Sequence, residues 1–229
     1  MNAILLAAGY GTRLKPITNS TPKCLVKIKN EPLLNIWLDK LTKAGIENIL
    51  INTHYLWKQV ENYVDKSLFK KKIKLEKENK LLGTAGTLIN NIDFFNNEDG
   101  FLIHSDNYCL EDLNNLIEAH KKRPTNCLMT MLTYQTSNPS SCGIVKINEK
   151  GIVKNFYEKS IKNYGSLANG AVYILSSQII KTIQNKFPYA KDFTKDILQN
   201  FLGKIYTYET INFFTDIGTP KEYEKAKNF

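Results

Sequence analysis

An apolar run over residues 3–8 opens directly into a loop that carries Gly9 and Gly11. A short apolar run that stops at a glycine is typical of a buried strand in a parallel sheet. Glycine lets a ligand approach the backbone closely, while Arg13 and Lys23 place fixed positive charge beside the loop. The start of the chain therefore predicts a buried strand followed by an anion-binding loop, and phosphate is the expected anion.

Two common nucleotide-binding loops do not fit these letters. The dinucleotide fingerprint requires a third glycine where this chain has Leu14, and an acidic residue at the end of the second strand. The expected second strand, residues 49–53, ends in asparagine and threonine and is followed by histidine. A Walker-type loop requires Gly-Lys-Ser/Thr, which follows neither Gly9 nor Gly83. The sequence thus disfavours NAD binding and ATPase or GTPase activity.

The composition is that of a globular protein. With 229 residues, 42% of them hydrophobic, the chain can form a sizeable core in one domain. No apolar stretch reaches membrane-spanning length and no charged leader precedes the first strand, so we expect a cytoplasmic protein without a membrane partner. The net charge of +9 comes from dispersed lysines, which disfavours nucleic acid as a partner. The 4 cysteines lack metal-ligand spacing.

Helical and strand periods alternate in the first half, which predicts an α/β, Rossmann-like fold with a doubly wound mixed sheet. There we expect strands over 3–8, 49–53, 73–75, 101–105 and 127–134, and helices over 33–41, 56–64, 84–95 and 113–120. In the second half, strands over 143–147 and 152–158 flank a hairpin turn. With strands over 167–175 and 205–209, they are expected to form a small antiparallel subregion. Short helices are expected near 177–185 and 192–201, and a terminal helix from 219.

The opening segment resembles the signature of the sugar-1-phosphate nucleotidyltransferases. That signature is a strand followed by Gly-x-Gly-Thr-Arg-Leu-x-Pro-x-Thr and, shortly after, Pro-Lys. The residues that match it are Gly9, Gly11, Thr12, Arg13, Leu14, Pro16, Thr18, Pro22 and Lys23. The later motifs of the family follow in order, so the resemblance covers the whole chain and implies a single nucleotidyltransferase domain over residues 1–229.

The resemblance implies an in-line displacement, in which a sugar-1-phosphate oxygen attacks the α-phosphorus of a nucleoside triphosphate. Catalysis then depends on aligning two anions and neutralising charge on the five-coordinate phosphorus. By resemblance, Arg13 holds the β- and γ-phosphates and Lys23 reaches the α-phosphate. The resemblance also implies that two loops bind the nucleotide, through Ala7, Ala8, Gly9, Gly11, Thr12, Gly83 and Thr84.

Two aspartates are expected to bind Mg²⁺. Asp106 follows the strand expected over 101–105, and ligands gather at strand ends in open α/β sheets. Asp216 lies in a later loop, and Mg²⁺ takes one or two carboxylates plus substrate phosphates. By resemblance, Asp106 matches the aspartate of the family's Gly-Asp motif and Asp216 that of its Asp-Ile-Gly-Thr-Pro motif. A cap or turn role is the alternative for each.

On the sugar side, Glu158 and Lys159 resemble the family's Glu-Lys pair, in which glutamate binds sugar hydroxyls and lysine binds the sugar phosphate. Gly143 and Asn169 resemble positions that line the sugar pocket. The usual Asn-Ala-Gly of the family reads Asn-Gly-Ala here, which leaves the sugar preference open.

Two further polar residues precede or follow these motifs. Glu78 lies just before the second nucleotide-binding loop, which contains Gly83 and Thr84. We expect its side chain to be a solvated charge; a contact with the base of the nucleotide is the alternative. His104 precedes Ser105 and Asp106, but neighbours on a strand point to opposite faces, so the three cannot form a catalytic triad. We expect His104 to be a packed or hydrogen-bonded core residue.

The leading hypothesis is a Mg²⁺-dependent transferase that uses a nucleoside triphosphate and a sugar 1-phosphate to form a nucleotide sugar for glycan biosynthesis. The first half looks most like mannose- or heptose-1-phosphate guanylyltransferases and muramic-acid uridylyltransferases, which favours GTP. A cytidylyl- or uridylyltransferase with another phosphoryl acceptor stays open, as does a non-catalytic nucleotide-sugar sensor on the same fold. A homo-oligomer also stays open.

Overall fold

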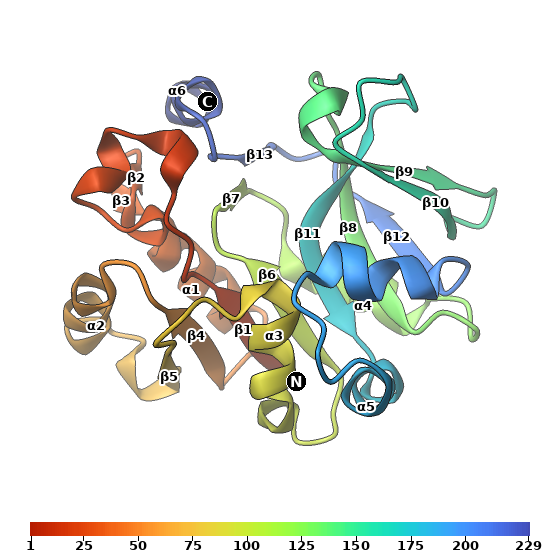
Figure 1. Cartoon of the computed structure of the whole chain (residues 1–229), viewed down its shortest axis with the longest axis horizontal. Helices are drawn as coiled ribbons and strands as arrows, with labels where there is room; N and C mark the ends of the chain where they lie inside the picture. Colours follow the sequence, from red (N-terminus) through yellow and green to blue (C-terminus); the bar gives the residue numbers. More distant parts are fainter.

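The N-terminal strand lies inside the parallel part of a mixed sheet. The computed structural model describes residues 1–229. In it, strands β6, β1, β4 and β5 are adjacent in that order, and each pairs in parallel with the next. Their bounds are Asn2–Leu6 for β1, Ile49–Thr53 for β4, Ile73–Lys77 for β5 and Gly100–His104 for β6. Because these strands are parallel, their carboxyl ends share one edge of the sheet (Figure 1).

Helices connect these strands and cover them. The α-helices are α1 (Leu33–Lys43), α2 (Trp57–Asp65), α3 (Gly83–Asn90), α4 (Leu113–Lys121), α5 (Ser177–Lys186) and α6 (Pro220–Asn228). The buried residues of α1 recur at helical spacing and are Leu33, Leu34, Trp37, Leu38 and Leu41. The helix ends before Gly45, whose φ of 77° suits glycine.

The hydrophobic core lies on both faces of the sheet. Along β1, Ala3 and Leu5 belong to one cluster, which includes the apolar face of α1. Ile4, between them, belongs to a second cluster that includes residues of α3 and α5. Alternate residues of a strand point to opposite faces, so a strand buried on both faces is apolar throughout. This accounts for the unbroken apolar run at the start of the chain.

The remaining strands of the sheet are mostly antiparallel. They are β8 (Met129–Gln135), β9 (Gly143–Ile147), β10 (Val153–Glu158), β11 (Leu167–Leu175) and β12 (Ile205–Glu209). Strand β11 pairs antiparallel with β8 along one side; on its other side it pairs antiparallel with β9 near its start and with β6 near its end. The expected mixed α/β fold is confirmed. The antiparallel strands, however, continue the main 9-stranded sheet through β11 and do not form a sheet of their own.

Two short antiparallel ladders lie outside the main sheet. Strands β2 (Lys27–Ile28) and β3 (Glu31–Pro32) form one of them. The other pairs β7 (Asn107–Cys109) with β13 (Phe214–Asp216), and it places Asp216 opposite Asn107. In Figure 1, β13 and α6 lie at the top of the view, between the two halves of the molecule. The β7–β13 ladder therefore brings a late segment of the chain to the carboxyl end of β6.

Several expected helices have different bounds or caps. The helix predicted from Thr84 to residue 95 is α3 followed by a separate 3₁₀ turn, Ile92–Phe95. Thr84 is not the N-cap of α3, because its hydroxyl accepts a hydrogen bond from the backbone N–H of Phe193, 2.8 Å away. The helix predicted near 192–201 is a π turn, Phe193–Ile197, followed by a 3₁₀ turn, Leu198–Phe201. The predicted hairpin between β9 and β10 and the Thr219 cap of α6 are confirmed.

None of the helices combines the length and the apolar character that crossing a membrane requires.

Candidate active site

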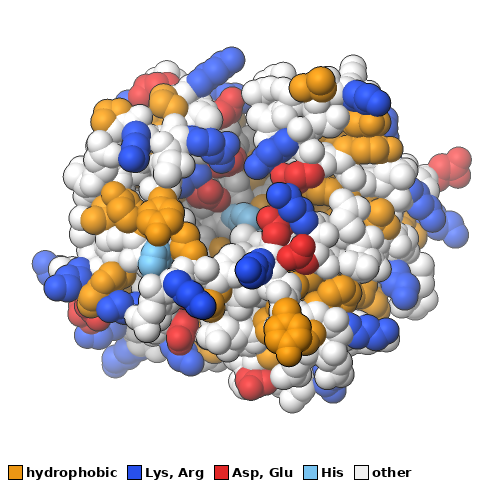
Figure 2. Space-filling view, viewed as in Figure 1, with side chains coloured by type: hydrophobic (Ala, Val, Ile, Leu, Met, Phe, Trp, Pro, Cys, Tyr) orange, Lys and Arg blue, Asp and Glu red, His pale blue; other side chains and the backbone are white.

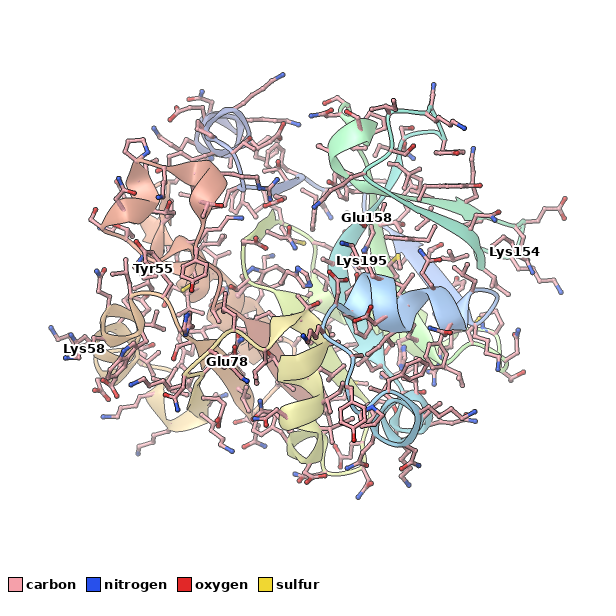
Figure 3. The ribbon with its side chains drawn as sticks, viewed as in Figure 1. Tyr55, Lys58, Glu78, Lys154, Glu158 and Lys195 are labelled. Carbon is pink, nitrogen blue, oxygen red and sulfur yellow. The ribbon has the colours of Figure 1, made fainter.

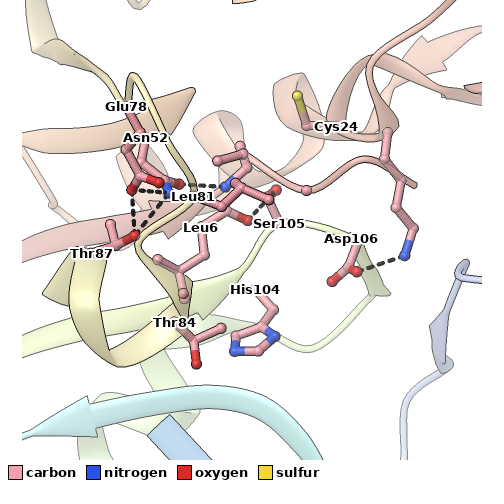
Figure 4. Close-up of a pocket in the computed structure, with 15 residues that line it drawn as sticks. Leu6, Cys24, Asn52, Glu78, Leu81, Thr84, Thr87, His104, Ser105 and Asp106 are labelled. Atoms are coloured by element: carbon pink, nitrogen blue, oxygen red, sulfur yellow. Dashed lines mark hydrogen bonds and ion pairs between the residues drawn. The ribbon is translucent and has the colours of Figure 1, made fainter. Parts of the chain in front are cut away.

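A cavity of about 250 Å³ lies at the carboxyl ends of β1 and β6. Of the residues predicted to bind a nucleotide, Ala7, Ala8, Gly9, Gly83 and Thr84 line it. Gly11 and Thr12 do not line it: Gly11 lies farther along the same loop, and Thr12 begins a 3₁₀ turn, Thr12–Leu14. Figure 4 shows the cavity, and Figure 2 shows the surface hollowed near the middle of this face, with acidic and basic side chains around the hollow.

The first glycine loop has a shape that only glycine allows at its second position. Gly11 has φ +64°, and a Cβ there would lie 2.8 Å from Cγ2 of Thr18. The Thr18 hydroxyl also donates a hydrogen bond to the Gly11 carbonyl, 2.7 Å away. Before the loop, the backbone N–H of Ala7 donates to Oδ1 of Asn52 at 2.7 Å. Side chains from later in the sequence thus hold both ends of the loop.

Lys23 bridges the two predicted metal ligands. Its Nζ lies 2.6 Å from Oδ2 of Asp106 and 3.1 Å from Oδ1 of Asp216. Burial alone would lower the pKa of Lys23, but its attraction to the two aspartates outweighs burial and raises the pKa. For Asp106, burial acts in the opposite direction and would raise the pKa, but the attraction of Lys23 lowers it to about 2. Lys23 and Asp106 therefore meet in their charged forms, next to the carboxyl group of Asp216.

Arg13 lies on the other side of Asp216. Its Nη2 is 3.6 Å from Oδ2 of Asp216, and its side chain is 56% exposed. Lys23 lines the first cavity, but Arg13 does not. Arg13 lines a second, neighbouring cavity, which is described below. The structure therefore places the two predicted catalytic cations on either side of the same carboxylate.

The inner end of the nucleotide cavity is a buried polar network around Glu78. Oε1 of Glu78 accepts hydrogen bonds from Nδ2 of Asn52 at 2.8 Å and from the Thr87 hydroxyl at 2.5 Å, and Oε2 accepts one from the backbone N–H of Leu82 at 3.1 Å. Glu78 is only 5% exposed. The expectation of a solvated charge at this position was wrong. The residues that bury Glu78 come from β4 and α3, so the sequence near Glu78 did not reveal its surroundings.

A second cavity of about 220 Å³ adjoins the first. All the residues predicted on the sugar side line it: Gly143, Glu158, Lys159 and Asn169. Figure 3 shows Glu158 and Glu78 on opposite halves of the molecule. A Cβ on Gly143 would lie 2.5 Å from Cζ of Phe156, so glycine is required where this strand meets β10. Lys159 has φ +43°, an uncommon conformation for a residue with a side chain.

The reordered Asn-Gly-Ala segment forms a bulge in β11. The pairing of β11 with β8 shifts register between Asn169 and Tyr173. Inside the bulge, Oδ1 of Asn169 accepts from the backbone N–H of Ala171 at 2.9 Å, while its Nδ2 donates to the Tyr173 hydroxyl at 2.6 Å. A Cβ on Gly170 would lie 2.7 Å from Cδ2 of Leu132. Glycine in the middle of this triplet therefore fits the close approach of β8.

Several residues that sequence reasoning did not assign also line the sugar-side cavity. Asp192 and Thr194 reach it from the π turn, and Tyr134 reaches it from β8. Asp192 also caps the turn, because its Oδ1 accepts from the backbone N–H of Thr194 at 2.9 Å and of Lys195 at 3.0 Å. An aspartate before Phe193 and Thr194 is a local sequence signal for an N-cap, but nothing in these residues indicates that they line a cavity.

His104 and Cys24 end up close to the predicted site. His104 lines both cavities, and burial lowers the pKa of its imidazole. Its Nε2 is buried without a hydrogen-bond partner, so of the two expected states, packed or hydrogen-bonded, the structure fits the packed one. Burial raises the pKa of the Cys24 thiol to about 12, which matches its expected role as a packing residue.

Comparisons with known proteins agree with this geometry. Mannose-1-phosphate guanylyltransferase catalytic subunit beta of Drosophila melanogaster is 30% identical over 226 residues, which are 96% of this chain and 60% of that protein. The D-glycero-alpha-D-manno-heptose 1-phosphate guanylyltransferase of Campylobacter jejuni is 28% identical over 225 residues, 97% of each chain. The crystal structure of HddC from Yersinia pseudotuberculosis complexed with GMP-PN has a TM-score of 0.82 at 26% identity, covering 99% of this chain and 98% of that one.

The first of these relatives is longer than this chain, which spans about 60% of its length. The family model described as nucleotidyl transferase matches residues 2–229. The chain therefore belongs to the nucleotidyl transferase family.

Proposed function

We propose that the chain transfers a nucleotidyl group from a nucleoside triphosphate to a sugar 1-phosphate, and that all 229 residues act as one nucleotidyltransferase domain. The observation that carries the proposal is the cluster of Lys23, Asp106 and Asp216 where the first cavity meets the second, more polar one. The first cavity would hold the triphosphate and the second the sugar phosphate. A phosphate oxygen of the sugar attacks the α-phosphorus, the bond to pyrophosphate breaks, and a nucleotide sugar forms.

The charges of the site suit this displacement. Two anions must approach each other, and negative charge builds up on the oxygens of the α-phosphorus. Lys23, at the floor between the cavities, would contact these oxygens and stabilise them. Arg13 is more exposed and does not line the first cavity, so it would bind the β- and γ-phosphates where they extend out of that cavity past Asp216. In the absence of substrates the two aspartates hold Lys23, and Asp216 also lies beside Arg13, so both cations are kept at the site.

Asp106 and Asp216 fit a Mg²⁺ site. Both carboxylates contact the same Nζ atom, so they lie close enough together to share one cation. The protein has no group of three or more acidic, histidine or cysteine residues that could hold a metal ion. Mg²⁺ does not need one, because it commonly takes one or two carboxylates and completes its coordination with phosphates and water. When bound, Mg²⁺ would supply positive charge to the triphosphate. Asp106 and Asp216 would hold the ion, and Lys23 would then turn towards the α-phosphate.

The base end of the cavity favours guanine. Glu78 offers about four acceptor positions on its two oxygens, and three hydrogen bonds within the protein use Oε1 twice and Oε2 once. Oε2 therefore keeps room for one more donor, such as the N1–H or the 2-amino group of guanine. The guanylyltransferases and the GMP-PN complex among the similar proteins support the same preference.

The polar side chains of the second cavity suit a sugar phosphate. Glu158 and Asn169 would bind hydroxyl groups, Gly143 would leave room for the ring, and Lys159 would bind the phosphate. The names of the similar proteins point to mannose 1-phosphate or a heptose 1-phosphate as the acceptor.

Pyrophosphate release tests the proposal. The purified chain is incubated with Mg²⁺ and with GTP, UTP, CTP or dTTP, each against mannose, heptose, glucose and N-acetylated sugar 1-phosphates. We expect turnover with GTP and mannose or heptose 1-phosphate. Turnover only with UTP or CTP, or only with a non-sugar acceptor, would contradict the substrate assignment. If the protein binds nucleotide sugars but no substrate pair is turned over, the proposed transferase activity is contradicted and a nucleotide-sugar sensor is indicated.

A further inference from the structure

Asp192 differs from the other acidic residues that line the second cavity, because its carboxylate forms no ion pair. The others are paired within the protein: Glu158 with Lys159, and Asp106 and Asp216 with Lys23. Asp192 is half-buried and lies in the turn that precedes Phe193. A carboxylate at the wall of a cavity, with no cation beside it, can accept hydrogen bonds from a ligand.

The two oxygens of Asp192 have different surroundings. Oδ1 accepts from the backbone N–H of Thr194 at 2.9 Å and of Lys195 at 3.0 Å, and from the Thr194 hydroxyl at 2.7 Å. Oδ2 takes no hydrogen bond within the protein, and it is not among the atoms that are shut off from solvent. Burial would raise the pKa of Asp192, but the hydrogen bonds from Lys195 and Thr194 outweigh burial and lower it. Oδ2 is therefore an accessible acceptor on a charged group.

Both chain neighbours of Asp192 bind the start of α3, which lines the first cavity. The carbonyl of Lys191 accepts a hydrogen bond from the backbone N–H of Ala85 at 3.0 Å, and the backbone N–H of Phe193 donates to the Thr84 hydroxyl at 2.8 Å. An acceptor in the second cavity is thus fastened to the wall of the first. A ligand group held by Asp192 would have a fixed position relative to the nucleotide loop.

The place and charge of Asp192 limit which ligand group it can hold. Asp192 lines the second cavity but not the first, so it faces the sugar phosphate and not the nucleotide. A carboxylate repels phosphate and accepts hydrogen bonds from hydroxyl groups. Lys159 supplies the positive charge that the phosphate needs. Figure 3 shows Glu158 and Lys195, which follows the Asp192 turn, on the same half of the molecule.

We propose that Oδ2 of Asp192 accepts a hydrogen bond from a hydroxyl group of the sugar phosphate, and that Asp192 is a second carboxylate for sugar recognition beside Glu158. The inference rests on the proposed function, since it requires a sugar in the second cavity. One hydroxyl donates one proton, so two carboxylates select an acceptor that presents two free hydroxyl groups. A sugar in which the hydroxyl facing Asp192 is absent or blocked would bind less well.

Asp192→Asn and Asp192→Ser test the proposal, because asparagine and serine both cap turns as well as aspartate does. In Asp192→Asn the amide oxygen stays with the N–H donors of the turn, so an NH₂ group replaces Oδ2. Asp192→Ser keeps the cap and has no second oxygen. We expect both variants to melt at the temperature of the wild type. With the substrate pair that the wild type turns over, the KM of the sugar 1-phosphate should rise about tenfold while that of the triphosphate stays within about twofold.

Deoxy sugar 1-phosphates identify the contact. The wild-type protein should bind one of them less well than the parent sugar 1-phosphate, and this penalty should disappear in Asp192→Ser. Penalties that are the same in both proteins overturn the inference. A rise in the KM of the triphosphate alone, or of both substrates together with a lower melting temperature, also overturns it and assigns Asp192 to the turn.

Asp112→Asn is the matched control. Asp112 is the N-cap of α4, its Oδ1 accepts from the backbone N–H of Asn114 at 2.9 Å, and it lines neither cavity. The same change of an aspartate cap should leave both KM values unchanged there. The inference is overturned if Asp192→Asn and Asp192→Ser behave like Asp112→Asn.

A failure of the proposed function would be recognised separately. If the wild-type protein transfers no nucleotide, the proposed function fails, and the dissociation constants of GDP-mannose and GDP are compared instead. Weaker binding of GDP-mannose to Asp192→Ser, with unchanged binding of GDP, supports the contact. Equal constants for GDP-mannose in the two proteins overturn it, and so does a wild-type protein that binds GDP-mannose no more tightly than GDP.

Discussion

The buried carboxylate of Glu111 accepts a hydrogen bond from the Thr210 hydroxyl and so ties the start of α4 to the segment between β12 and β13. Asn212 donates to the same oxygen at 2.9 Å, and the Tyr208 hydroxyl donates to the other oxygen at 3.2 Å. Burial would raise the pKa of Glu111, but its hydrogen bonds outweigh burial and lower it. Because β13 follows this segment and ends at Asp216, Glu111 helps to place a proposed metal ligand that it does not touch.

Removing the Glu111 carboxylate should therefore affect both stability and turnover. Glu111→Ala leaves several buried donors unpaired, so we expect the free energy of unfolding to fall by about 3 kcal/mol, measured by urea unfolding. Turnover should fall as well, because β13 is held less firmly. Glu118→Ala is the control, since Glu118 forms an exposed ion pair with Lys121 and its loss should leave stability nearly unchanged. Equal effects of the two changes would argue against the role of Glu111.

Lys23→Met should separate catalysis from folding. It removes the cation that lies between Asp106 and Asp216, so we expect kcat to fall by about 10²–10³-fold, as when a donor to a charged transition state is lost. GTP binding should weaken less, because the base end of the cavity is untouched. Lys74→Met on β5 is the control, since Lys74 is an exposed residue on an edge strand. A variant that kept more than about a tenth of the wild-type kcat would contradict the role of Lys23.

Glu78→Gln should change the choice of base. The amide keeps the size of the side chain but replaces one acceptor oxygen with a donor, so the remaining acceptor for guanine is lost or misdirected. We expect the KM of GTP to rise about tenfold. Glu61→Gln on the exposed face of α2 should leave kinetics unchanged. If Glu78→Gln lowered stability and left the KM of GTP as it was, Glu78 would be a structural residue only.

His120 should make stability depend on pH. Burial lowers the pKa of His120 below its ordinary 6.5, although the hydrogen bond with Asp99 opposes this. The unfolded chain then binds the proton more readily, so stability is greatest above about pH 6.5 and falls as the pH is lowered through that value. Melting temperatures between about pH 7.5 and 5 should show this slope. In His120→Phe the slope should be smaller, and an unchanged slope would assign the effect to other groups.

The fold could be predicted largely from local patterns. The apolar run of β1, the helical spacing on α1 and the turn between β9 and β10 were each strong enough to identify the element. Predictions failed where one segment caps or pairs with another that is distant in sequence. Threonine is a common N-cap residue, but the hydroxyl of Thr84 accepts a hydrogen bond from the backbone N–H of Phe193 and does not cap α3. Similarly, β11 joins the antiparallel strands to β6, and no local signal specifies that contact.

The site was predicted where residues are adjacent in sequence and missed where they come from different elements. Lys23 and residues of the first glycine loop, which line the first cavity, were predicted from sequence motifs. So were the neighbouring Glu158 and Lys159, which line the second cavity. The burial of Glu78 and the unpaired nitrogen of His104 could not, because both depend on side chains from other strands and helices.

The sequence by itself determined most of the strands and helices, and it predicts which charged residues take part in phosphate chemistry, because periodicity and motifs are local properties. Only the tertiary structure decided that Lys23, Asp106 and Asp216 share one point, although 83 and 193 positions separate Lys23 from the two aspartates. The physical reason is that parallel strands align their carboxyl ends, while the β7–β13 ladder brings the end of the chain to that edge.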